Sequence, residues 1–149
     1  MSKTFFSATW LACVALFFLL LAGVTAHAAE AALKLEAQLV VGSNDPHSTN
    51  GLPVSVQVAK KLGRLPLKWS YYFVVSSQQF AVAKDEFKEV SLSSECQISV
   101  KNLGGENVQL TLLGNGLNVG KIKQGLPKGH TIVAGANDGN SIVVLRQAD

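Results

Sequence analysis

The second half of the chain restricts the fold most, because it is a series of short alternating segments separated by turn sequences. The segments cover residues 96–101, 108–113, 117–123, 130–134 and 141–147. The turns between them contain Gly104-Gly105, Asn115-Gly116, Pro127-Lys128-Gly129 and Asp138-Gly139. Asn-Gly and Asp-Gly supply the positive φ angles that tight hairpins need. We therefore expect an all-β fold, an antiparallel meander that forms a sandwich or a partly open barrel.

The first half adds further strands and one short helix. Period-2 alternation of apolar residues predicts strands at 33–41 and 87–92, and aromatic and β-branched residues predict them at 69–75 and 79–83. The segment 55–62 is expected to be helical, since Ser55 can cap its first turn and Gly63 can end it. Lys60 and Lys61 also suit the negative end of such a helix.

The N-terminus has the three parts of a secretory signal. Lys3 is the only charged residue before Glu30, residues 10–24 are apolar, and Ala26 and Ala28 occupy the −3 and −1 positions of a cut after Ala28. Residues 1–28 are therefore predicted to be a signal peptide and residues 29–149 a single β-rich domain. The alternative is an uncleaved signal that anchors the protein in the membrane.

Charge and cysteine content limit the partners and the chemistry of the exported part. The chain has a net charge of +3, to which Lys3 contributes, and two cysteines, of which Cys13 lies in the signal. So mild a charge does not indicate a nucleic-acid partner. Cys96 is then alone, so no internal disulfide can form. Its place in an alternating segment predicts a small buried hydrophobic residue.

The residues that usually carry catalysis do not form a recognisable pattern. Asp45 and His47 share a turn-rich loop without further ligands, and His130 lies beside a turn without a nucleophile motif. The clustered carboxylates are typical of a solvated surface and not of a hydrolase: Asp85, Glu86, Glu89 and Glu95. We expect no catalytic residue, no metal and no cofactor, and hence no enzyme.

Two features instead suggest binding. Four basic residues lie within nine positions that contain no acid: Lys60, Lys61, Arg64 and Lys68. They are expected to form a basic patch opposite the acidic stretch 85–95, or else ordinary solvated charge. In the aromatic stretch, alternation places Tyr72 on the face opposite Trp69, Tyr71 and Phe73. Tyr72 is then an exposed candidate for contacting a protein or a sugar, although core packing also explains these rings.

Several segments together resemble a group of small exported bacterial β-rich proteins with no assigned activity. They are LKLEAQLVVGSNDP, PLKWSYYFVV, SLSSECQISVKNLG, LPKGHTIVAG and SIVVLRQ. The resemblance covers most of the chain after the signal, and it implies a bacterial, extracytoplasmic protein without transferring any functional residue.

These observations predict a non-enzymatic protein of the bacterial envelope or secretome that serves as a protein-interaction or structural module. Its partner is expected to be another envelope or secreted protein, reached for example through an edge strand. The alternative is a small-ligand or carbohydrate-binding module. The location is expected to be periplasmic or secreted, with no stable membrane span after signal cleavage.

Overall fold

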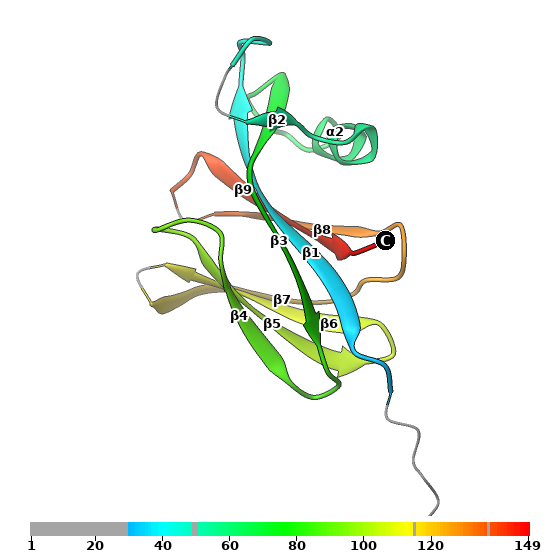
Figure 1. Ribbon diagram of the computed structural model, residues 1–149. Helices are drawn as coiled ribbons and strands as arrows, with labels where there is room; N and C mark the ends of the chain where they lie inside the picture. Colours follow the sequence, from blue (N-terminus) through cyan, green and yellow to red (C-terminus); the bar gives the residue numbers. More distant parts are fainter. Residues whose placement is uncertain (1–29, 49–50, 115, 137) are drawn as a thin grey trace, which may run out of the picture.

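Two antiparallel β-sheets face each other in the computed structural model (Figure 1), which describes residues 30–48, 51–114, 116–136 and 138–149. The predicted signal peptide, residues 1–28, lies outside the described residues. The all-β fold with one short helix is confirmed. Of the two expected architectures, the sandwich is the one adopted, and the described strands form no closed barrel.

Sheet A combines strands from the beginning and from the end of the described part of the chain. Its order is β2 (Leu52–Pro53), β3 (Tyr71–Val82), β1 (Leu33–Ser43), β9 (Ser141–Gln147) and β8 (Thr131–Gly135). The first long strand therefore lies in the middle, with β3 on one side and the last strand on the other. Only the β8–β9 pair in this sheet is a simple hairpin of the kind that the turn sequences predict.

Sheet B is a meander in chain order. It contains β4 (Phe87–Ser91), β5 (Gln97–Gly104), β6 (Asn107–Gly114) and β7 (Leu117–Gly125). Each strand pairs with the next along the chain. The β5–β6 turn uses Gly104 and Gly105 at φ values of 84° and 59°, a conformation that glycine adopts at low cost. The predicted meander thus describes this sheet correctly.

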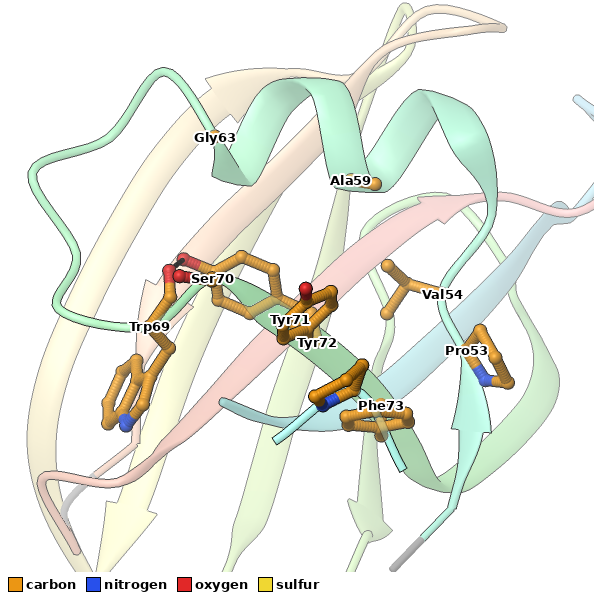
Figure 2. A pocket seen from close by; sticks show the side chains of 10 residues that line it. Pro53, Val54, Ala59, Gly63, Trp69, Ser70, Tyr71, Tyr72 and Phe73 are labelled. Atoms are coloured by element: carbon orange, nitrogen blue, oxygen red, sulfur yellow. Dashed lines mark hydrogen bonds between the residues drawn. The ribbon is translucent and has the colours of Figure 1, made fainter. Parts of the chain in front are cut away.

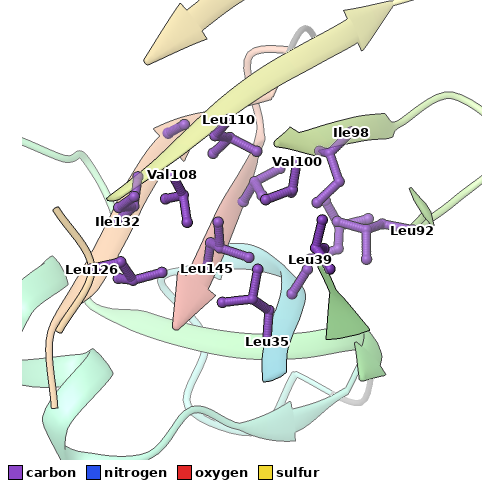
Figure 3. Packing of buried hydrophobic residues seen from close by; sticks show 14 residues of the cluster. Leu35, Leu39, Leu92, Ile98, Val100, Val108, Leu110, Leu126, Ile132 and Leu145 are labelled. Atoms are coloured by element: carbon purple, nitrogen blue, oxygen red, sulfur yellow. The ribbon is translucent and has the colours of Figure 1, made fainter. Parts of the chain in front are cut away.

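The main core fills the space between the two sheets (Figure 3). Sheet A contributes Leu35 and Leu145 from neighbouring strands, and sheet B contributes Ile98 and Leu110, all of them fully buried. Complete burial of such a side chain stabilises the fold by about 1.5–3 kcal/mol. Packing of these alternating residues, without any disulfide among the described residues, holds the sheets together.

β3 unites two segments that the sequence pattern separates at residues 76–78. A bulge at Val75 shifts the register, because Leu39 pairs with Ser76 whereas Val40 pairs with Val74. One extra residue in a strand changes which face the following side chains occupy. Phe80 beyond the bulge therefore packs against the main core, whereas Val74 before it packs on the opposite face of sheet A.

A second core lies on that opposite face, beneath helix α2 (Val56–Leu62). Val58 and Leu62 of the helix are buried against Val40 and Val144 of the sheet. The hydroxyl of Ser55 accepts a hydrogen bond from the Val58 amide, and Gly63 ends the helix. The helix, its cap and its end are those predicted.

Candidate functional site

Helix α2 presents three sides, and each has a different neighbour. Val58 and Leu62 face sheet A. Ala59 and Gly63 border an aromatic hollow on one flank. The other flank of the helix borders a groove beside the start of β8. The residues that line the groove on this side are Gln57, Lys60, Lys61 and Arg64. The short helix therefore positions two concave surfaces at once.

The groove beside β8, which we call the α2 groove, has a volume of about 520 Å³ and a basic lining. Lys60, Lys61 and Arg64 meet His130 there, and no acidic residue is among the described lining residues. Lys61 Nζ donates a hydrogen bond to the backbone carbonyl of Thr131, which ties the helix to β8. Lys60 and Arg64 are exposed, so their charges are available to a partner.

Lys68, the fourth residue of the predicted basic patch, does not line the α2 groove. Its Nζ lies 4.9 Å from the centre of the Trp69 ring, a cation–π arrangement. It borders a separate hollow with Ala136 and Ile142. The patch predicted from sequence therefore divides into a cluster of three and one cation bound to an aromatic ring.

The aromatic hollow has a volume of about 460 Å³ and lies beneath the other flank of α2 (Figure 2). Trp69, Tyr71, Tyr72 and Phe73 line it together with Pro53. Its volume falls in the range of small-molecule sites, which are about 300–1,000 Å³ and largely apolar.

Tyr72 lies in the second core and not on the surface, so the prediction of an exposed Tyr72 ring is wrong. Its exposed fraction is 7%, whereas that of Tyr71 is 43%. The Tyr72 hydroxyl donates a hydrogen bond of 3.1 Å to the Trp69 carbonyl, and burial raises its pKa. The cause is the second core, because α2 covers the face of β3 that Tyr72 shares with Val74.

His47 and His130 have different surroundings in the fold. The Asp45 carboxylate accepts a hydrogen bond of 2.9 Å from the His47 amide, so Asp45 closes a turn through its own side chain. His130 is exposed and borders the α2 groove. Across the described ranges, no three His, Cys, Asp or Glu side chains come together in a group suited to a metal ion.

The acidic residues of 85–95 lie on and around β4 in sheet B, and α2 lies on the outer face of sheet A. Sheet A therefore separates the basic groove from the acidic stretch. Asp85, Glu86, Glu89 and Glu95 are all exposed, as a solvated face requires. The predicted segregation of the two charge clusters corresponds to different layers of the sandwich.

No protein-family model, curated protein or solved structure matches this chain. The resemblance to small exported bacterial proteins therefore stays a prediction. In the part of the chain that the structure describes, no helix combines the length and the apolar character needed to cross a membrane.

His130 and Tyr71 are the site residues that sequence reasoning missed. His130 lies 66 positions after Arg64 in the sequence, so only the packing of α2 beside β8 brings them to one groove. The basic residue Lys128, two positions before His130, is a weak indication in the sequence that this turn belongs to a basic surface. Alternation alone places Tyr71 on the buried side of its strand, because the covering of the opposite face of β3 by α2 cannot be recognised from the local pattern.

Proposed function

We propose that this protein is an exported, non-enzymatic binding protein whose α2 groove engages an acidic segment of another envelope or secreted protein. The observation that supports this most is the meeting of Lys60, Lys61, Arg64 and His130 around one groove with no acid in its described lining. Charge complementarity of this kind steers encounter and fixes the orientation of a partner.

The arrangement of the groove also favours binding over catalysis. Reaction chemistry needs a nucleophile or base oriented by a second group at hydrogen-bond distance. The side chains of Lys60 and Arg64 are exposed cations, and the one oriented cation, Lys61, is held by a backbone carbonyl. Such an arrangement suits recognition of carboxylates by several positive groups.

Retention of a partner from an envelope fraction tests the proposal. The double variant Lys60→Glu and Arg64→Glu reverses two exposed groove charges and leaves Lys61 in its structural hydrogen bond. Lys121→Glu with Lys123→Glu on β7 is the matched control, since both residues are exposed and neither is among the described lining residues of the groove. The immobilised wild type and the control should retain the same partner, and the groove variant should lose it.

Salt provides the second arm of that experiment. Contacts between exposed charges weaken when the Debye length falls from about 10 Å at 0.1 M to about 3 Å at 1 M salt. Retention by the wild type should therefore fall as salt rises. A wild-type protein that retains nothing at low salt, or two double variants that lose the partner equally, would contradict the proposal.

The aromatic hollow supports the second candidate function, binding of a small ligand or carbohydrate. Tyr71 is 43% exposed at the rim and is suited to stack against a sugar ring. A thermal-shift screen of soluble saccharides should then give a stabilisation that Tyr71→Ala removes. If no saccharide shifts the unfolding midpoint of the wild type, this candidate is eliminated.

A further inference from the structure

The outer side of β3 is unpaired over most of its length. β1 pairs with β3 from Tyr71 to Val82, whereas β2 covers only Phe73 and Val74 on the other side. From Val75 onward, no described strand pairs with that outer side. β3 runs alongside β1 (Figure 1). Its free segment 75–81 is largely exposed and offers backbone groups for another strand.

The register identifies which backbone groups face outward. The Lys34 carbonyl accepts a hydrogen bond from the Ala148 amide, so even-numbered residues of β1 direct their backbone groups towards β9 and odd-numbered ones towards β3. Odd residues of β1 lie opposite even residues of β3, as Ala37 does opposite Gln78. The outward-facing residues of the free segment are therefore Ser77, Gln79 and Ala81.

The other outer strands carry features that oppose strand addition. β4 carries the charged residues Lys88 and Glu89, and β7 carries Lys121 and Lys123. On β8, the backbone carbonyl of Thr131 already accepts a hydrogen bond from Lys61 Nζ. The segment 75–81 (VSSQQFA) contains no charged residue and no proline. Natural edge strands are usually protected by such residues, so an unprotected edge indicates an intended partner.

We propose that a second copy of this chain occupies this edge, with β3 antiparallel to β3 and Gln79 on the two-fold axis. Ser77 of each copy then lies opposite Ala81 of the other, and Gln79 lies opposite Gln79. All three outward-facing residues form hydrogen-bonded pairs, so each copy donates three backbone hydrogen bonds and accepts three. The two sheets A become one continuous sheet.

Two features make this edge complementary to itself. A glutamine amide both donates and accepts, so two Gln79 side chains can pair across the axis, and no like charges are opposed. The antiparallel arrangement also brings the Val75 end of one copy to the Val82 end of the other. Exposed apolar residues lie near both ends, because Leu52 pairs with Val74 and Phe87 follows the turn at 83–86. Their exposed fractions are 76% and 66%.

The molar mass of the exported protein, measured by sedimentation or light scattering over a concentration series, tests this interface. The wild type should be a dimer, and Gln79→Lys should raise the dissociation constant at least about tenfold by opposing two like charges. Gln124→Lys is the matched control, since it places the same charge on an exposed residue of another outer strand, β7. The control should remain dimeric.

A charge-swap experiment distinguishes self-pairing from a general loss of association. Gln79→Lys and Gln79→Glu should each be monomeric, and their equimolar mixture should form a heterodimer, because only self-pairing at Gln79 places the two charges together. A wild type that stays monomeric to about 1 mM overturns the proposal. A dimer that Gln79→Lys leaves intact, or a mixture that does not associate, overturns it as well. The groove variant, Lys60→Glu with Arg64→Glu, should not affect the dimer.

Discussion

The carboxylate of Glu36 near the start of β1 accepts a hydrogen bond of 2.8 Å from Arg146 Nε near the end of β9, so the first and the last described strands are joined on the outer face of sheet A. Ser77 Oγ of β3 donates to the same carboxylate at 2.9 Å. Glu36 is 7% exposed. This one carboxylate therefore links three strands, β3, β1 and β9, beside the second core.

Glu36→Gln should lower the free energy of unfolding by about 1–3 kcal/mol at neutral pH, because a buried charged acceptor is lost opposite Arg146. Urea unfolding of the variant and of the wild type provides the measurement. Glu89→Gln on the exposed surface of β4 is the control and should change stability little.

The stability that Glu36 supplies should depend on pH. Burial by itself raises the pKa of Glu36, but hydrogen bonds from Gln38, Ser77 and Arg146 and the charge of Arg146 outweigh burial, and the pKa is lowered overall. A carboxylate whose pKa is lower in the folded state stabilises the fold at pH values above its pKa in the unfolded state, which is about 4.3. This stabilisation is lost as the pH falls through its pKa in the folded state. The difference between wild type and Glu36→Gln should therefore shrink below about pH 4. A constant difference at every pH would contradict this assignment.

Gly42→Ala should destabilise the protein by about 1–3 kcal/mol, because the new Cβ would overlap the indole ring of Trp69, which packs against the second core. Gly120→Ala on β7 is the matched control, since its Cβ would lie 3.6 Å from Leu112 Cδ1 in ordinary contact. The midpoints of thermal unfolding should differ between the two variants. Equal midpoints would show that Trp69 does not require a glycine at position 42.

Cys96 should behave as a packed thiol and not as a reactive one. It is half-buried against the main core, and burial, followed by the charge of Asp138, raises its pKa. Since the thiolate is the reactive form, reaction with a disulfide reagent at pH 8 should be at least about tenfold slower in the folded protein than in urea. Equal rates would place the thiol at the surface. The dimer proposed above should persist in Cys96→Ala, since it involves no disulfide.

If the predicted signal is cut after Ala28, the purified protein should begin at Ala29. Ala28→Arg should block that cut, because the −1 position accepts only small residues. Intact mass spectrometry of both proteins is the measurement. A wild type that retains residues 1–28 and fractionates with membranes would instead support the uncleaved anchor.

Most of the local structure follows from patterns of neighbouring residues. Alternation located β1 and β4 to β9 to within a few residues, and glycine-containing turns located the β5–β6 and β6–β7 hairpins. Ser55 and Gly63 marked the two ends of α2. The two-residue strand β2 was not predicted, and β3 was predicted as two separate segments. Each of these signals depends on φ preferences, capping or side-chain periodicity, which act over a few neighbouring residues.

The strand order of sheet A, the burial of Tyr72 and the set of residues around the α2 groove depend instead on long-range packing. β1 lies between β3 and β9, which no local pattern specifies. The bulge at Val75 depends on the pairing of β3 with β1 and places Phe80 in the main core, whereas Tyr72 is buried because α2 packs on the opposite face of sheet A. His130 joins Lys60 and Arg64 because α2 packs beside β8. These features arise from contacts between residues far apart in the chain, and such contacts are specified by the packing of complete sheets.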